Sequence, residues 1–218
     1  MKFGTAKEDA FRRDATIKSL FYNLDKQQVE DLTRKSLNDM AVGIIRTPLE
    51  PCHTFIDDPL RVLRIIRFAS KLGYAIDEEA KQSMKDKRIR TALNEKVSRE
   101  RIGIEVIKMM NDRNPSLAFK LIYEADLYAT VFLGLTDSDH PWSITWPHAY
   151  QVLAALLDDT ASVGKTLGKE LVQFEEKGEN LWTTAAYAPI ASLRRTDWKL
   201  NQVVKDVTEA MRATKKLT

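Results

Sequence analysis

The chain has 218 residues, 44% hydrophobic and 30% charged, a composition that indicates a soluble globular protein and excludes extensive disorder. Its 34 Lys and Arg residues against 31 Asp and Glu residues give a formal net charge of +3, which permits an anionic partner without requiring one. The single cysteine, Cys52, excludes an intramolecular disulfide framework, and with only three histidines a structural zinc cluster lacks ligands.

The N-terminal residues predict a short polar helix followed by a β-hairpin. Residues 5–15 read as the helix, because Thr5 and Glu8 have the spacing of a reciprocal capping box. Residues 19–24 and 28–32 then have the pattern of two short strands joined by a tight turn.

The next segment predicts one helical turn and one more strand. Residues 36–42 form the turn, which Gly43 ends, and residues 44–47 form the strand before Pro48 and Pro51 break the regular structure. So few strands would be marginally stable alone, so we expect an incomplete α+β segment.

From Pro59 onward the hydrophobic periodicity is helical. Capping signals divide the remainder into helices predicted at residues 59–72, 77–93, 98–111, 115–123, 150–176 and 181–215. Residues 135–147 predict an irregular loop, and Pro189 predicts a helix break. The predicted fold class is mainly α, with a small incomplete α+β part at the N-terminus.

The helix that follows Asp57 carries a periodic basic stripe. Steps of three residues place Asp58, Arg61, Arg64 and Arg67 on one slowly rotating face. One interpretation is structural, because Asp58 suits an N-cap, proline suits the first helical position, and arginines often solvate a helix.

The other interpretation is that Asp58 and Arg61 read a nucleobase. Cytosine and adenine each offer an amino donor beside a ring-nitrogen acceptor, which a carboxylate and a guanidinium match. Uracil and guanine would set acceptor against acceptor and donor against donor. Arg64 and Arg67, further along the stripe, would suit a triphosphate.

A second motif is Arg12-Arg13-Asp14, which directly precedes the first predicted strand. Adjacent cations can bind phosphates and the carboxylate can bind ribose hydroxyls. Taken alone, the motif is a weak signal, and a solvated helix end is the more frequent explanation of it.

Together these segments resemble the CCA-adding tRNA nucleotidyltransferases, especially the eukaryotic type, of the poly(A) polymerase/CCA-adding family. The resemblance is carried by three stretches in family order, Gly4 to Asn23, Ile45 to Ala69 and Lys96 to Glu105. Three motifs in order are more specific than one, so the resemblance favours base reading for Asp58 and Arg61.

The resemblance implies a role for each matching residue. Arg13 and Asp14 would bind the phosphate and ribose of the incoming nucleotide, and Asp58 with Arg61 would select CTP and then ATP. Arg64 and Arg67 would complete nucleotide binding. Glu100, Arg101 and Glu105 match a motif whose expected role is to brace the neck helices.

The resemblance also implies three parts: residues 1–50 a partial nucleotidyltransferase head, residues 51–134 a helical neck with the base-recognition motif, and residues 135–218 a helical body. The expected function is CCA addition to the tRNA 3′ end, with CTP and ATP as substrates. No apolar run approaches the roughly 20 residues that span a bilayer. We therefore expect no membrane partner and an intracellular location, with cytoplasm, nucleus and mitochondrion left open.

Two departures from the family pattern matter. Lys18-Ser19 stands where the family has an Asn-Ala pair. The family's Gly-Gly loop and Asp-x-Asp strand are absent, and nucleotidyl transfer needs clustered carboxylates for two metal ions. We therefore predict no catalytic and no metal-binding residue in this chain, and we expect it to be a truncated form, inactive alone. The complete enzyme would need Mg²⁺ and a chain or segment that supplies the missing head.

Several alternatives and lookalikes accompany this interpretation. The chain could instead be a noncatalytic RNA-binding or structural module derived from the same family. We reject Asp137-Ser138-Asp139 as the metal motif because it lies far downstream, and Gly164-Lys165-Thr166 as a P-loop because the required earlier glycine is Asp159. Trp142, Trp146 and Trp182 could stack on RNA bases, but we favour a place in the core.

Overall fold

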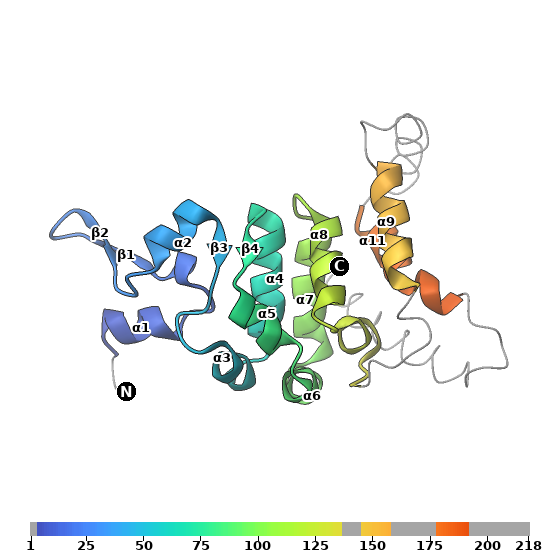
Figure 1. Cartoon of the computed structure of the whole chain (residues 1–218), viewed down its shortest axis with the longest axis horizontal. Helices are drawn as coiled ribbons and strands as arrows, with labels where there is room; N and C mark the ends of the chain where they lie inside the picture. Colours follow the sequence, from blue (N-terminus) through green and yellow to red (C-terminus); the bar gives the residue numbers. More distant parts are fainter. Residues whose placement is uncertain (1–3, 137–144, 158–177, 192–218) are drawn as a thin grey trace.

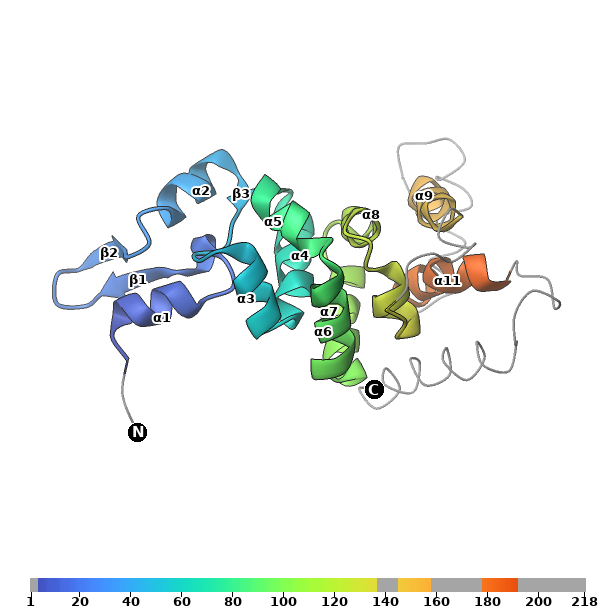
Figure 2. The same ribbon diagram turned by 60° about the horizontal axis from the view of Figure 1, so that its bottom comes forward.

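The computed structural model describes residues 4–136, 145–157 and 178–191. Both views place the N-terminal helix and hairpin at one end of an elongated molecule and the last two described helices at the other (Figures 1 and 2). Between them lies a stack of helices, so the predicted fold class, mainly α with a small β remnant, is confirmed.

The N-terminal segment folds as its local signals predict. Helix α1 (Ala6–Arg12) begins at the capping box, where the Thr5 Oγ1 accepts from the Glu8 N–H at 3.2 Å and the Glu8 carboxylate accepts from the Thr5 N–H at 2.7 Å. A 3₁₀ turn, η1 (Thr16–Lys18), leads into β1 (Leu20–Asn23), which pairs antiparallel with β2 (Gln28–Asp31).

The next elements join this segment to the helices. Helix α2 (Ser36–Val42) ends at Gly43, whose φ of 71° is the left-handed conformation that glycine adopts without strain. Strand β3 (Ile44–Ile45), shorter than predicted, pairs in parallel with β4 (Ala75–Ile76), a strand that the sequence did not predict.

The segment after β3 differs from the prediction. Pro51 was expected to break regular structure, but it begins α3 (Pro51–Asp57). Proline suits the first helical turn, and the Glu50 carboxylate accepts from the N–H groups of Cys52 at 2.9 Å and His53 at 2.6 Å. Glu50 is thus the N-cap of α3, which was not predicted from the sequence.

Helix α4 (Leu60–Leu72) is the centre of the helical stack and ends at Gly73, as predicted. Leu63 and Ile66 on its apolar side are fully buried. It packs against α7 (Arg99–Met110), which Ser98 caps, and α8 (Pro115–Glu124). No side chain caps α4, so the expected N-cap role of Asp58 is wrong.

The predicted helix at residues 77–93 is in fact two. Helix α5 (Glu78–Met84) stops at Lys85, and α6 (Lys87–Lys96) starts where the Asp86 side chain accepts from the Arg88 N–H at 2.8 Å. A local cap therefore outweighs the continuous periodicity.

The C-terminal described elements are a π-helical turn, η2 (Ala129–Leu133), and the helices α9 (Trp146–Leu157) and α11 (Gly178–Ala191). Trp146 was expected in a loop but begins α9, and α11 continues past Pro189 where we expected a break. Asp137 to Asp139, Trp142, Gly164 to Thr166 and the predicted helical residues 192–215 lie outside the described residues. None of the helices in the described ranges is long and apolar enough to cross a membrane.

An aromatic cluster fixes α9 and α11 to the helical stack. The Trp146 side chain is fully buried, and its ring centroid lies 4.0 Å from that of Tyr128 and 5.7 Å from that of Phe119. Trp182 is only 5% exposed and lies 5.1 Å from Phe119. Both tryptophans are therefore core residues, as favoured from the sequence.

We predict that Trp146→Ala lowers the free energy of unfolding by about 3–5 kcal/mol, the usual cost of truncating a buried tryptophan. The indole Nε1 has no hydrogen-bond partner within the described residues, so the loss is one of packing. Urea unfolding followed by circular dichroism measures it. Val152→Ala on the same helix, at a side chain that is 59% exposed, is the control and should change stability little. Equal effects of the two substitutions would contradict the packing role.

Candidate nucleotide-binding site

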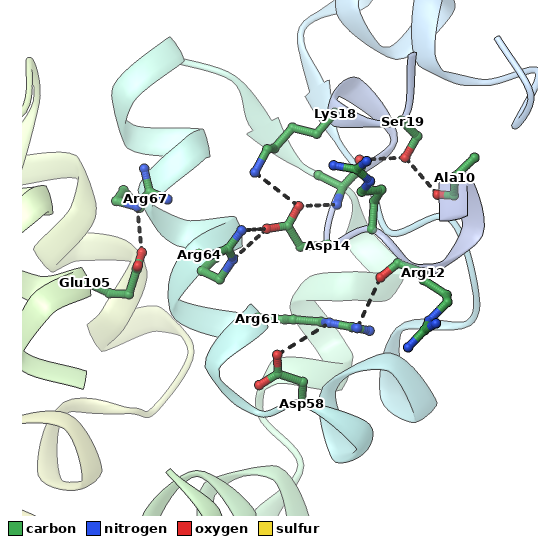
Figure 3. A network of polar contacts seen from close by, with 12 residues as sticks. Ala10, Arg12, Asp14, Lys18, Ser19, Asp58, Arg61, Arg64, Arg67 and Glu105 are labelled. Atoms are coloured by element: carbon green, nitrogen blue, oxygen red, sulfur yellow. Dashed lines mark hydrogen bonds and ion pairs between the residues drawn. The ribbon is translucent and has the colours of Figure 1, made fainter. Parts of the chain in front are cut away.

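The candidate site lies where the segment after α1 meets the first turns of α4 (Figure 3). Asp14 sits at its centre and is only 5% exposed. Its Oδ1 accepts from the Ala15 N–H at 3.0 Å and lies 3.6 Å from the Lys18 Nζ. The carboxylate is therefore anchored by its own loop before any contact with α4.

Arg64 connects Asp14 to α4. Its Nε and Nη2 both lie 2.6 Å from the Asp14 Oδ2 (Figure 3). These are short, charge-assisted hydrogen bonds, and they join residues 50 positions apart. The structure thus brings together two predicted site residues from different segments.

Asp58 and Arg61 face each other at the start of α4. The Arg61 Nε lies 3.8 Å from the Asp58 Oδ2, and the Arg61 Nη2 donates to the Arg12 carbonyl oxygen at 3.1 Å (Figure 3). The Asp58 side chain is 37% exposed, and its carboxylate accepts no hydrogen bond from the described residues. It is therefore free to accept one from a ligand.

Arg67 lies two turns of α4 beyond the Asp58 and Arg61 pair and turns toward α7. The Arg67 Nε donates to the Glu105 Oε2 at 2.7 Å, which ties α4 to α7 (Figure 3). The structure does not bring Arg67 to Asp58.

Glu105 is a buried carboxylate held by two cations. Burial acts to raise its pKa, but hydrogen bonds from Arg67 and from Lys108, at 3.1 Å, more than offset burial and lower the pKa below its ordinary value. The charged form is thus the one that the fold stabilises. This geometry agrees with the bracing role expected for Glu105.

Arg13 also lies apart from the other candidate residues. Its guanidinium pairs with Asp9 at 2.5 Å and lies 5.8 Å from the Phe21 ring centroid. Two groups that the sequence analysis did not single out do lie at the site, the Arg12 carbonyl and the Lys18 ammonium. The replacement of the family's Asn-Ala pair by Lys18-Ser19 was the available signal for Lys18.

The described residues do not fit a metal ion. In residues 4–136, 145–157 and 178–191, no group of three or more His, Cys, Asp or Glu side chains could hold one. Asp14, the most buried carboxylate of the site, is already bound by Arg64 and Lys18.

Comparison with known proteins identifies the family. The model described as "Poly A polymerase head domain" matches residues 1–46, and the one described as "Probable RNA and SrmB- binding site of polymerase A" matches residues 73–138. Neither range includes residues 47–72, which carry Asp58 and Arg61.

Curated relatives are similar over much of the chain. The "CCA tRNA nucleotidyltransferase, mitochondrial" of Saccharomyces cerevisiae is 50% identical over 136 residues, which are 62% of this chain and 25% of the relative. The "tRNA nucleotidyltransferase cca2" of Schizosaccharomyces pombe is 34% identical over 189 residues, 87% of this chain and 38% of the relative. The chain belongs to the poly(A) polymerase and CCA-adding nucleotidyltransferase family. It spans about a quarter of the length of the first yeast relatives.

Solved structures of this family share the fold. A "tRNA-processing enzyme (apo form I)" covers 96% of this chain with a TM-score of 0.68 at 21% identity, and the match includes 50% of that protein. The Bacillus stearothermophilus CCA-adding enzyme in complex with CTP covers 97% with a TM-score of 0.59, also at 21% identity, and 56% of that protein is matched. At such identities the likeness establishes the fold and leaves side-chain roles to the geometry.

We predict that Arg67→Met destabilises the fold by about 1–3 kcal/mol at neutral pH, because it leaves the buried Glu105 carboxylate with one partner fewer. The pKa of Glu105 is lowered in the folded state, so its charge stabilises the fold above its ordinary pKa of 4.5 and this contribution fades as pH falls further. The difference between wild type and variant should therefore shrink below about pH 4.5, in urea unfolding at a series of pH values.

Arg101→Met is the matched control on α7. Arg101 is exposed, and its side chain pairs with no described residue, so its loss should be within about 0.5 kcal/mol at every pH. A pH-independent loss in Arg67→Met would show that the ion pair is not its cause.

Proposed function

We propose that this chain is the nucleotide-selecting portion of a CCA-adding tRNA nucleotidyltransferase, with CTP and ATP as nucleotides and the tRNA 3′ end as acceptor. The observation that carries the proposal is the paired Asp58 carboxylate and Arg61 guanidinium, 3.8 Å apart and partly exposed, at the junction of the N-terminal segment with α4. Relatives named CCA or tRNA nucleotidyltransferases and neighbours solved with ATP and with CTP support it.

Selection would follow from donor and acceptor patterns. The Asp58 carboxylate accepts from the amino group of cytosine or adenine while Arg61 donates to the adjacent ring nitrogen. For uracil or guanine the same two side chains would meet a carbonyl and an N–H. Both side chains would then lack a hydrogen-bond partner, which costs free energy in a partly desolvated site. Arg61 is held in place by the Arg12 carbonyl, so its position is set before the nucleotide arrives.

The remaining candidate residues would bind the sugar and phosphates. Asp14 would accept from a ribose hydroxyl, and Arg13, Arg64 and Arg67 would supply positive charge for the phosphates. Of these cations, Arg64 lies nearest to Asp14, whereas Arg13 pairs with Asp9 and Arg67 with Glu105. Phosphate binding by the last two would require exchange of these partners.

The proposed division is a partial head at residues 1–50, a neck at 51–134 and a body at 135–218. Mg²⁺ is expected for the complete enzyme, with its ligands supplied by a segment or chain outside the described residues. The alternative, a noncatalytic RNA-binding module, draws on the family description of residues 73–138. An intracellular location is part of the proposal, since relatives from two yeasts are named mitochondrial.

We predict that Asp58→Ala and Arg61→Ala each weaken CTP and ATP binding by roughly 10-fold to 100-fold, because each removes a hydrogen bond to or from a charged group. Discrimination against UTP and GTP should disappear in both variants. Isothermal titration calorimetry with all four nucleotides, on the 218-residue chain, measures both effects.

Asp57→Ala is the control for this pair. Asp57 is adjacent in sequence, 68% exposed and 3.9 Å from the Arg61 Nη2, so it matches Asp58 in charge but stays in solvent. It should keep the preference for CTP and ATP. Unchanged preference in Asp58→Ala would overturn the assignment, and binding of RNA without nucleotide preference would favour the module.

We further predict that the chain alone adds no nucleotides to tRNA lacking its 3′ end when incubated with Mg²⁺, CTP and ATP. The reason is that the described residues offer no carboxylate cluster for the metal ions that nucleotidyl transfer requires. Denaturing gels with labelled CTP measure addition at single-nucleotide resolution. Robust addition, abolished by the double substitution Asp137→Asn and Asp139→Asn, would instead assign the metal site to that downstream pair.

A further inference from the structure

Lys18 extends from the N-terminal segment toward α4 and is not among the candidate nucleotide-binding residues. It is the last residue of η1, and its Nζ lies 3.6 Å from the Asp14 Oδ1 (Figure 3). The same Nζ lies 4.5 Å from the ring centroid of Phe68. The side chain is 36% exposed. The ammonium is therefore held at the site yet accessible from solvent.

The Lys18 ammonium has donors that make no hydrogen bond within the described residues. A protonated lysine offers three donors, and within the described residues the Lys18 Nζ makes no hydrogen bond, only the ion pair at 3.6 Å. Both Asp14 oxygens already accept hydrogen bonds from other groups, the Oδ1 from the Ala15 N–H and the Oδ2 from Arg64. An anion that reached Lys18 would accept hydrogen bonds from its ammonium without displacing a strong hydrogen-bond partner.

Positive charge accumulates around Phe68. The Arg67 guanidinium carbon lies 4.5 Å and the Arg64 guanidinium carbon 6.0 Å from the ring centroid that Lys18 also contacts. Asp14 and Glu105 balance two of these three cations, and Lys108 adds a fourth at Glu105. The ring face tolerates cations, but the cluster retains net positive charge that a multivalent anion would neutralise.

The cluster of cations around Phe68 lies along α4 from Asp58 and Arg61, where the phosphates of a nucleotide bound by that pair would lie. Arg61 and Phe68 are separated by seven residues, about 10 Å along a helix that rises about 1.5 Å per residue. Asp14 lies between them, bound to Arg64. A nucleotide with its base at Asp58 and Arg61 and its ribose at Asp14 would direct its phosphates toward Lys18.

We propose that Lys18 is a phosphate-binding residue of this site and that its ligand is the triphosphate of the incoming nucleotide, an inference that rests on the proposed function. At this position Lys18 supplies a positive charge beside Asp14. The added charge strengthens binding in proportion to the charge of the phosphate chain and contributes little to base selection.

The test compares Lys18→Met and Lys18→Asn with wild type in titrations of CMP, CTP and inorganic tripolyphosphate. Both variants should bind CTP and tripolyphosphate roughly tenfold more weakly, equivalent to about 1.4 kcal/mol, while CMP binding stays within about twofold. Loss of CTP affinity should diminish at high salt, since exposed charges are screened. Lys26→Met is the matched control, because Lys26 also pairs with an acidic residue four positions away, Glu30 at 3.5 Å, but lies on the hairpin.

Each other outcome overturns the inference in a distinct way. Equal weakening of CMP and CTP would mean that Lys18 acts by positioning Asp14, and tighter binding of both would mean that it competes with ribose for Asp14. A loss seen only with single-stranded RNA would assign Lys18 to the RNA backbone. If wild type binds CTP in an Asp58-dependent manner and Lys18→Met has no effect, only this inference fails. If wild type binds neither CTP nor tripolyphosphate, the proposed function fails with it.

Discussion

The site depends on a buried carboxylate that must be paired. Asp14 is 5% exposed, and an ionised group so far from solvent is tolerated only when cations and hydrogen-bond donors compensate its charge. Arg64 supplies that compensation from α4, across 50 residues of chain. Such a pair adds little net stability relative to apolar packing, yet loss of one partner is costly, so it fixes one arrangement of the two segments. The contact of Arg61 with the Arg12 carbonyl belongs to the same arrangement.

Polar side chains contribute to the buried part of the N-terminal segment. Its buried residues include Thr16, Ser19 and Asp39, whereas Tyr22 and Leu37 are more than half exposed. Asp39 accepts from the Thr16 hydroxyl at 2.7 Å and lies 3.5 Å from the Arg46 Nε. The helical stack behind α4 has the opposite character, with fully buried aliphatic and aromatic side chains. The candidate site therefore lies at a boundary between a segment specified by hydrogen bonds and one specified by apolar packing, where charged side chains can stay partly hydrated.

The sequence predicted the elements that local signals determine, but it did not predict contacts between residues far apart in the chain. Some features depend only on residues a few positions apart and could therefore be predicted from the sequence. They are the capping box at Thr5, the hairpin, and the left-handed glycines at 43 and 73. The pairing of β3 with β4 joins residues 31 positions apart, and two-residue strands carry no periodicity. At the site, spacing of three predicted that Asp58 and Arg61 would meet, and they do. The partner of Arg67 is 38 positions away on α7, and no local pattern could identify it.

Pairing among the candidate residues has an energetic consequence for any ligand. Asp14, Arg61 and Arg64 already have intramolecular partners, so a nucleotide gains only the difference between its own contacts and those that it replaces. Contacts that replace nothing contribute in full. The Asp58 carboxylate and the Lys18 ammonium make no short hydrogen bond inside the described structure. One lies at the base end and the other at the phosphate end of the proposed site, so discrimination between bases and attraction of phosphates would rest on separate residues. Base selection could then change at Asp58 without loss of phosphate binding, and phosphate affinity could change at Lys18 without loss of selectivity.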